Sequence, residues 1–130
     1  MKKICIVTST YNSKITNRIK LLAQSELKKN GIKKIDSINV PGAFEIPVTI
    51  SKIKNRYDGF VAIGCIVKGE TANFDLISKS IIDGIMNLSI QIKKPIGNCI
   101  LTLFNRKQAI NRVNRGKEAA KAVIEILKIK

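Results

Sequence analysis

Short apolar segments of strand length alternate along this chain with longer segments of helical periodicity, and this alternation most constrains its fold. Residues 4–8 form a near-continuous apolar run, which is typical of a strand covered on both faces. Residues 59–67 form the strongest run and are predicted to be a central strand. Weaker patterns over 35–40 and 96–102 predict two further strands.

The segments between and after these strands carry apolar residues at helical spacing. The predicted helices cover residues 13–30, 44–54, 73–92, 105–111 and 116–128. Asn12 or Ser13 is expected to cap the first helix and Gly31 to end it, while Pro47 is acceptable only near the first turn of the second. Strands that alternate with helices require right-handed crossovers and a parallel sheet. The predicted fold is an α/β three-layer α/β/α sandwich, with a four-stranded parallel sheet and helices on both faces.

Length and composition exclude several classes of protein. A chain of 130 residues suits one core, so residues 1–130 are expected to form a single domain. No apolar run reaches the roughly 18 to 20 residues of a membrane-spanning helix, so no membrane is expected as a partner. The 24 basic and 9 acidic residues give a net charge of +15, which raises the alternative of a nucleic-acid-binding protein. The basic residues are scattered and aromatic residues make up only 5%, so no specific nucleic acid is expected.

Three cysteines lie far apart, each within an apolar segment of predicted strand: Cys5, Cys65 and Cys99. No C-x-x-C pair is present, and we expect reduced, buried thiols in a cytoplasmic protein. The chain has no histidine to complete a mixed ligand set for zinc. We therefore predict no metal site and no cofactor.

Ligands of parallel sheets bind beyond the carboxyl ends of the strands. This rule selects residues 10–12, 41–45 and 68–73 and the loop after Thr102. In the second segment, Gly42 permits close approach of the backbone, and Glu45 can accept hydrogen bonds from a ligand. The alternative is an ordinary turn in which Glu45 favours the helix dipole.

The segment Lys68-Gly69-Glu70-Thr71 precedes the longest predicted helix. Its glycine, free amides, lysine and hydroxyl group predict an anion site at a helix N-terminus, although the pattern is not a Walker A loop. The alternative is a simple capped helix start with Thr71 as the N-cap.

Three motifs resemble those of the lumazine synthase family. Val-Pro-Gly-Ala-Phe-Glu-Ile-Pro at residues 40–47 looks like the most distinctive stretch of that family. Ile-Gly-Cys-Ile-Val-Lys-Gly-Glu-Thr at 63–71 resembles its L-G-x-V-I-R-G-E-T, and Gln-Ala-Ile-Asn-Arg at 108–112 resembles its Q-A-I-E-R. The resemblance runs in register from residue 4 to about residue 127.

The resemblance implies an enzyme of riboflavin biosynthesis. Such enzymes condense 5-amino-6-(D-ribitylamino)uracil, a ribitylaminouracil, with 3,4-dihydroxy-2-butanone 4-phosphate, a butanone phosphate, to give 6,7-dimethyl-8-ribityllumazine, phosphate and water. By the resemblance, Tyr11 stands where the family has an aromatic ring stacked on the pyrimidine. The segment that holds the ribityl chain and ring is matched by Ala43, Phe44 and Glu45, and the strand end whose backbone recognises the pyrimidine by Cys65, Ile66 and Val67.

The same resemblance implies a phosphate subsite. Glu70 and Thr71 match the phosphate-binding helix start. Arg112 matches an arginine that a neighbouring subunit supplies to the same phosphate, and Arg115 stands where the family has the lysine of N-K-G. The resemblance thus implies a homo-oligomer with sites between subunits.

Two positions depart from the family pattern. Asn73 stands in the place of the histidine that acts as proton donor, and the chain contains no other imidazole. Asn98 stands where many relatives carry Phe against the pyrimidine. We expect a slower enzyme that works mainly by proximity, in which water, Lys68 or the substrate's own phosphate relays protons.

The expected assembly is a homopentamer. The loop between Arg112 and Asn114 is shorter than in capsid-forming relatives, and the chain starts almost directly at the first predicted strand. Both features favour a pentamer over a 60-subunit shell. The main alternative function is a non-catalytic relative that binds flavin or lumazine, which would explain the missing histidine but would leave the phosphate-binding residues without a substrate.

Overall fold

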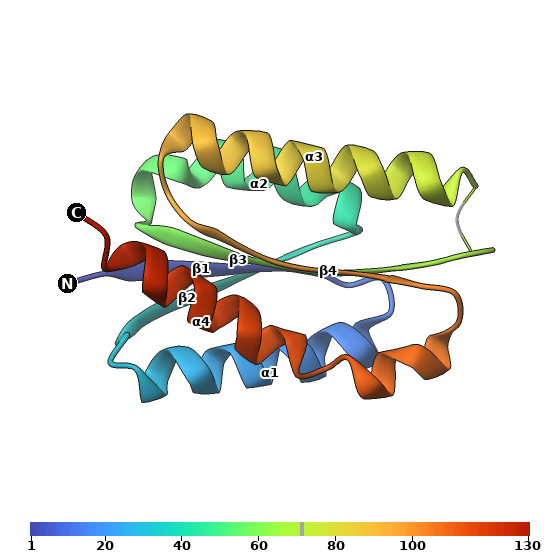
Figure 1. Ribbon diagram of the computed structural model, residues 1–130, viewed down its shortest axis with the longest axis horizontal. Helices are drawn as coiled ribbons and strands as arrows, with labels where there is room; N and C mark the ends of the chain where they lie inside the picture. The colour runs from blue at the N-terminus through green and yellow to red at the C-terminus, as the bar shows by residue number, and fades with distance from the viewer. Residues whose placement is uncertain (71) are drawn as a thin grey trace.

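Four parallel strands form the centre of the computed structural model, which describes residues 1–70 and 72–130 (Figure 1). They are β1 (Lys3–Ser9), β2 (Lys34–Val40), β3 (Gly59–Val67) and β4 (Ile96–Leu103), and their order in the sheet is β2-β1-β3-β4. Strands β1 and β3 are therefore the inner strands, as predicted for residues 59–67, and every residue of β3 is buried.

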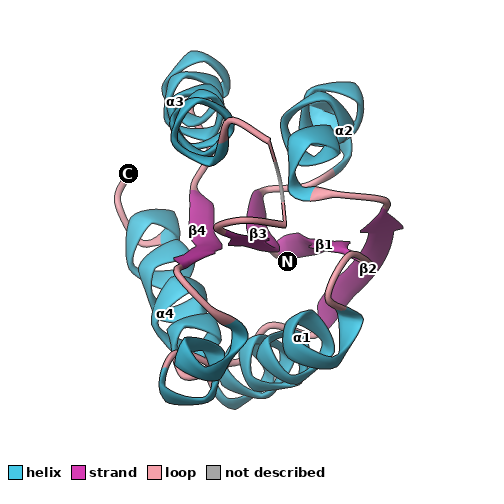
Figure 2. Cartoon of the chain, turned by 90° about the vertical axis from the view of Figure 1, so that its right-hand side faces the viewer, coloured by secondary structure: helices cyan, strands magenta, loops and turns pink. Residues whose placement is uncertain are grey.

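Helices cover both faces of this sheet. Helices α1 (Ser13–Lys29) and α4 (Arg115–Leu127) lie on one face, and α2 (Ile46–Ile53) and α3 (Phe74–Ile92) lie on the other (Figure 2). The chain moves outwards from β1 to β2 and then returns past β1 to β3. Two right-handed crossovers that run in opposite directions along a sheet place their helices on opposite faces. Helices α1 and α2 are therefore separated by the sheet. The predicted three-layer α/β/α sandwich is confirmed.

Each face of the sheet has its own apolar core, because successive side chains of a strand point to opposite faces. In β1, Ile4 and Ile6 pack against α1 and α4, whereas Cys5 and Val7 pack on the side of α2 and α3. Both faces of the inner strands are thus covered by helices, which explains why the sequence there is apolar without alternation.

Three short 3₁₀ turns adjoin the predicted helices: η1 (Ala43–Glu45), η2 (Lys54–Arg56) and η3 (Arg106–Asn111). The helix expected from residue 44 is therefore α-helical only from Ile46, which leaves Pro47 in the first turn, where its missing N–H matters least. The helix expected over 105–111 is a 3₁₀ turn, in which the Asn105 side chain accepts a hydrogen bond from the Gln108 amide at 3.3 Å.

Asn12 occupies the N-cap position of the first helix, as expected, but it does not cap the helix with its side chain. It has a left-handed backbone (φ 61°), and its side chain makes no capping hydrogen bond. Its carbonyl oxygen instead accepts hydrogen bonds from the amides of Ile15 and Thr16. Gly31 follows the helix with φ 88°, as expected for a residue that ends it.

Within the part of the chain that the structure describes, no helix combines the length and the apolar character needed to cross a membrane.

Helices α1 and α4 approach each other closely at Gly116. A Cβ atom added there would lie 2.5 Å from the Ile19 carbonyl oxygen and 2.7 Å from the Ile19 Cγ2 atom. Neither the backbone oxygen nor the branched side chain of a fully buried isoleucine can move aside without shifting a helix.

The substitution Gly116→Ala should therefore lower the free energy of unfolding by about 1 to 3 kcal/mol, measured by urea denaturation at fixed protein concentration. Gly84→Ala is the matched control, because its added Cβ would make ordinary contact at 3.6 Å with the Pro47 ring. The control should be neutral or more stable by up to about 1 kcal/mol, as for glycine in a helix interior. Equal stability of the two variants would contradict the close packing.

Candidate functional site

The carboxyl ends of the four strands bring the predicted ligand-binding segments to one edge of the sheet, on the right in Figure 1. Backbone hydrogen bonds join these segments in pairs. The Tyr11 amide donates to the Pro41 carbonyl oxygen at 3.1 Å, which ties the loops after β1 and β2. The Lys68 amide donates to the Leu103 carbonyl oxygen at 2.8 Å, which ties the ends of β3 and β4.

The turn that follows β2 packs tightly against the central strand. Ala43 is buried, and a Cβ atom added to Gly64 of β3 would lie only 2.9 Å from the Ala43 methyl group. The Glu45 carboxylate turns back over Gly42, where a Cβ atom would be 3.3 Å from Oε1. The Phe44 side chain is 65% exposed. This segment therefore offers a carboxylate and an open aromatic ring near the strand ends.

Glu70 is the centre of a cluster of three side chains from three different loops. Arg106 of η3 donates from Nε to Oε2 at 2.8 Å and from Nη2 to Oε1 at 2.9 Å. The Tyr11 hydroxyl donates to Oε1 at 2.8 Å. The loop after β3 is thus bonded through one carboxylate to the loops after β1 and β4.

These hydrogen bonds change the acidity of the cluster. Arg106 first, and then Tyr11, lower the pKa of Glu70 from 4.5 to about 2, because both donate to the ionised carboxylate. The same bond raises the pKa of Tyr11, since a phenolate could no longer donate to Glu70. The cluster is therefore fully formed above pH 4.5 and is lost only as the pH falls through about 2.

Lys68 and Asn73 lie on either side of the same loop, and both are exposed. The Lys68 ammonium nitrogen is 5.4 Å from the centroid of the Phe104 ring, in a cation–π arrangement. Asn73 precedes α3 with a left-handed backbone (φ 58°) and makes no side-chain capping hydrogen bond. Thr71 lies outside the described residues, so its role stays a prediction.

Cys65, Ile66 and Val67 form the last part of β3 and are 2 to 4% exposed. Their side chains belong to the apolar cores on the two faces, so only their backbone could meet a ligand at the strand end. Burial raises the pKa of the Cys65 thiol to about 11, which keeps it protonated at neutral pH. This thiol is therefore not an activated nucleophile.

Three predicted residues lie apart from the Glu70 cluster within the single chain. Arg112 donates to the Thr102 carbonyl oxygen at 3.2 Å. Asn98 is exposed on the edge strand β4, where its Oδ1 accepts from the Ile100 amide at 3.0 Å. Arg115 is exposed at the start of α4. Among the described residues, none of these three is hydrogen-bonded to Glu70.

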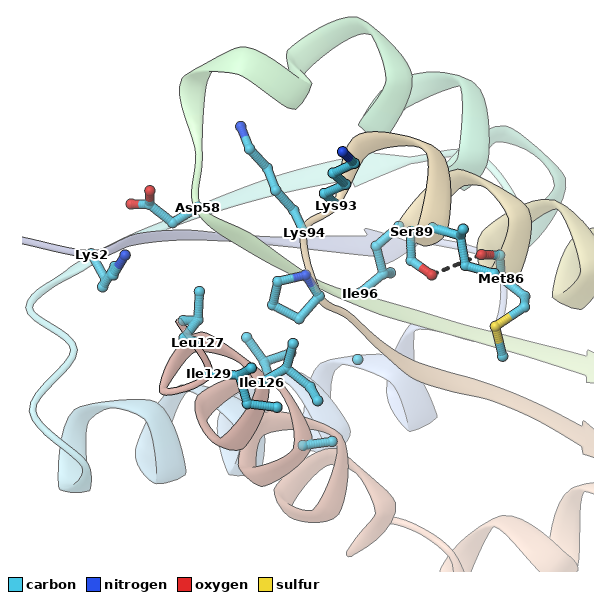
Figure 3. A pocket seen from close by; sticks show the side chains of 15 residues that line it. Lys2, Asp58, Met86, Ser89, Lys93, Lys94, Ile96, Ile126, Leu127 and Ile129 are labelled. Carbon is cyan, nitrogen blue, oxygen red and sulfur yellow. Dashed lines mark hydrogen bonds between the residues drawn. The ribbon is translucent and has the colours of Figure 1, made fainter.

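Two hollows lie at opposite ends of the sheet. The larger, about 790 Å³, lies by the amino ends of the strands between α3 and α4, with apolar side chains such as Met86 and Ile126 in its walls (Figure 3). The smaller, about 520 Å³, lies at the carboxyl ends and is lined by residues 10–15 and Arg106. Since ligands of parallel sheets bind beyond the carboxyl ends, the smaller hollow adjoins the candidate site.

Arg106 and Phe104 join the site although no sequence motif points to them. Both lie in the loop after β4, just before the Gln-Ala-Ile-Asn-Arg motif at 108–112. The position of that loop was predictable, but the pairing of Arg106 with Glu70, 36 positions away in the chain, depends on how far each loop extends.

The comparison with known proteins gives one consistent result. The sequence pattern that defines the 6,7-dimethyl-8-ribityllumazine synthase family matches residues 1–130. The chain is 38% identical to a 6,7-dimethyl-8-ribityllumazine synthase of Albidiferax ferrireducens over 129 residues, which cover 95% of this chain and 82% of the relative. It is 34% identical to the synthase of Limosilactobacillus reuteri over 134 residues, which cover 98% of this chain and 88% of the relative. With its motifs at the carboxyl edge of a parallel sheet, this chain belongs to the 6,7-dimethyl-8-ribityllumazine synthase family.

Proposed function

We propose that this protein catalyses the formation of 6,7-dimethyl-8-ribityllumazine in riboflavin biosynthesis. Its substrates would be 5-amino-6-(D-ribitylamino)uracil and 3,4-dihydroxy-2-butanone 4-phosphate. The observation that carries this proposal is the meeting of all four strand-end segments at one edge of the sheet, in a chain matched by this enzyme family over residues 1–130.

The ribitylaminouracil would bind between the loops after β1 and β2. The Tyr11 ring would stack on the pyrimidine, and the backbone at the end of β3 would recognise its polar edge. Glu45 would accept hydrogen bonds from ribityl hydroxyl groups beside Phe44. The close contact of Ala43 with Gly64 supports this arrangement, because it holds the turn directly against the strand end.

The phosphoryl group of the second substrate would bind at the start of α3. Glu70 and Thr71 belong to this loop, and Lys68 adds positive charge at its base. The amides at the N-terminus of a helix favour an anion, and the Asn73 side chain does not cap those of α3. By the family resemblance, Arg112 and Arg115 would reach the same phosphate from a neighbouring subunit, and Arg112 would then have to exchange its hydrogen bond to the Thr102 carbonyl oxygen for the phosphate.

Catalysis would depend mainly on holding the two substrates together. The 5-amino group of the uracil attacks the ketone carbonyl and forms an imine with loss of water. Loss of a proton from the adjacent hydroxyl-bearing carbon then expels phosphate, and the resulting enol tautomerises to a new ketone. The ribitylamino nitrogen attacks this ketone and closes the second ring with loss of a second water. Proximity alone can lower such a barrier by about 7 to 11 kcal/mol. Asn73 cannot titrate near neutral pH, so water, Lys68 or the substrate phosphate would carry the protons.

Purified protein mixed with both substrates should therefore form fluorescent lumazine faster than the spontaneous reaction. Glu45→Ala should lower the rate by about tenfold or more, since it removes a charged hydrogen-bond acceptor from the ribityl subsite. A rate equal to the spontaneous one, together with tight binding of flavin, would instead favour the non-catalytic relative.

The variant Asn73→His should turn over faster than the parent, by roughly 10² to 10⁴ if proton transfer limits the rate. Its rate should also gain a pH dependence near about pH 6.5 beyond any that the substrate phosphate gives the parent, because only the variant has an imidazole. Histidine is among the residues that tolerate a left-handed backbone, so the helix start should keep its shape.

Lys93→His is the matched control for that variant. Lys93 has the same left-handed backbone (φ 58°) but lies at the opposite end of α3, so it introduces an imidazole far from the candidate site. Its rate should equal that of the parent. A rate for Asn73→His no higher than that of the control would refute a proton-donor role at position 73.

We further propose that the protein is a homopentamer with its sites between subunits. Several large apolar side chains of η1, α2 and α3 are more than half exposed: Phe44, Val48, Leu76, Met86 and Ile90. Surfaces of this kind are typical of contacts between proteins. The free, buried thiols of Cys5, Cys65 and Cys99 fit a reducing compartment, and we propose the cytoplasm.

Light scattering should give about 72 kDa, five times the 14.4 kDa mass of the chain. Arg112→Ala and Glu45→Ala should each lower activity, and subunits of the two variants mixed by joint refolding should regain about a quarter of the parent activity. The recovery is expected because a quarter of the interfaces would combine one intact Glu45 with one intact Arg112. A monomer, or no recovery on mixing, would contradict sites shared between subunits.

A further inference from the structure

Arg106 is the charged residue of the strand-end cluster to which the family motifs assign no role. Its guanidinium group makes two hydrogen bonds to the Glu70 carboxylate, at 2.8 and 2.9 Å. The Tyr11 hydroxyl shares one oxygen of that carboxylate at 2.8 Å. Arg106 also lines the hollow at the carboxyl ends of the strands, beside residues 10–15.

The geometry of this pair favours orientation more than stability. The Arg106 side chain is 62% exposed and that of Glu70 is 27% exposed, and ion pairs at such a surface contribute little to folding. A planar guanidinium group that makes two hydrogen bonds to a carboxylate, however, fixes the direction of both groups. Arg106 therefore holds Glu70, and Glu70 in turn limits rotation of the Tyr11 hydroxyl.

The charge of Glu70 matters because of its neighbours. This carboxylate lies between Lys68 and the start of α3, in the loop that we propose receives a phosphoryl group. With Arg106 holding its pKa near 2, Glu70 is ionised at every working pH. An unpaired carboxylate at this position would repel a phosphate dianion. The Arg106 guanidinium group offsets the negative charge of Glu70, because its Nε atom lies 2.8 Å from the Glu70 Oε2 atom.

We propose that Arg106 is a positioning residue that acts on both substrates through Glu70. It neutralises the carboxylate of the loop after β3, so that an anionic substrate can bind there. It also keeps the Tyr11 ring at a fixed place beside that loop, so that a planar ring can stack on it. This inference rests on the proposed function. It adds Arg106, from the same chain as Glu70, to a phosphate subsite that we otherwise assign to the loop at 68–73 and to Arg112 of a neighbouring subunit.

Removing the charges of both Arg106 and Glu70 distinguishes the positioning role of Arg106 from direct contact of Arg106 with the phosphoryl group. Arg106→Gln should raise the KM for the butanone phosphate about fivefold, with kcat changed less than about twofold, because the Glu70 charge is left unpaired. The double variant Glu70→Gln with Arg106→Gln should return this KM to within about twofold of the parent. If Arg106 bound the phosphoryl group itself, the double variant would stay as weak as the single one, and the proposal would be overturned.

Lys107→Gln is the matched control. It removes the same charge one position along the chain, and its exposed side chain is not a partner of Glu70. Its KM should stay within about twofold of the parent. A rise equal to that of Arg106→Gln would mean that only overall charge matters and would also overturn the proposal.

Two measurements need no turnover and so separate this inference from the proposed function. Binding of inorganic phosphate, followed by ³¹P NMR, should weaken in Arg106→Gln and recover in the double variant. The chain has two tyrosines and no tryptophan, so NMR of ring-labelled tyrosine should give two signals, assigned with Tyr57→Phe. In Glu70→Gln the pKa of Tyr11 should fall towards its ordinary value while that of Tyr57 stays unchanged.

The combined outcomes are decisive in each direction. If no lumazine forms but phosphate binding and the Tyr11 titration change as described, the proposed function fails and the positioning role of Arg106 stands. If lumazine forms normally while neither the KM nor phosphate binding responds to Arg106→Gln, the inference fails and the proposed function stands.

Discussion

Burial of β3 between two helical layers is the constraint on which the rest of the structure depends. All nine of its residues are buried, so this strand lies inside the sheet and the polar residues that follow it meet solvent only beyond its carboxyl end. Its neighbours β1 and β4 run parallel to it, which sends every carboxyl end to the same edge. From β1 the chain first adds β2 on one side and then β3 on the other, so α1 and α2 lie on opposite faces of the sheet. The loops after β1 and β3 therefore diverge, which leaves a crevice for a ligand at that edge.

Local sequence was sufficient to predict the sheet, its four strands, the helical layers and the segments at the strand ends, because each depends on apolar periodicity or on a turn. It was insufficient for Arg106, whose partner Glu70 is remote in the chain, and for the 3₁₀ form of residues 106–111, which no periodicity separates from a short α-helix. Nor could it predict that Arg112 would contact its own β4, since a side chain of that length has several acceptors in reach.

The strand-end edge belongs to a chain with a net charge of +15 and no histidine, so it holds few groups that titrate near neutral pH. At neutral pH Glu70 stays ionised and Cys65 stays protonated, and the chain has no histidine that could donate or accept a proton there. Helices α1 and α3 both begin at an asparagine with a left-handed backbone, and neither the Asn12 nor the Asn73 side chain caps its helix. Helix starts of this kind favour anions, which fits the phosphate subsite that we propose better than it fits acid–base chemistry.

The contact between Gly64 and Ala43 has a consequence for how this edge could change during evolution. The strand and the turn meet through a hydrogen atom and a methyl group, and a Cβ atom on Gly64 would lie 2.9 Å from that methyl group. Alanine at position 64 therefore requires glycine at position 43, after which the nearest neighbours of the new methyl group would be the Ile100 Cδ1 atom at 3.2 Å and the Cα atom of residue 43 at 3.5 Å. Any larger side chain at this contact would push the turn away from the strand, so ligand preference can diverge more readily at the exposed rim around Phe44 than at the floor beneath it.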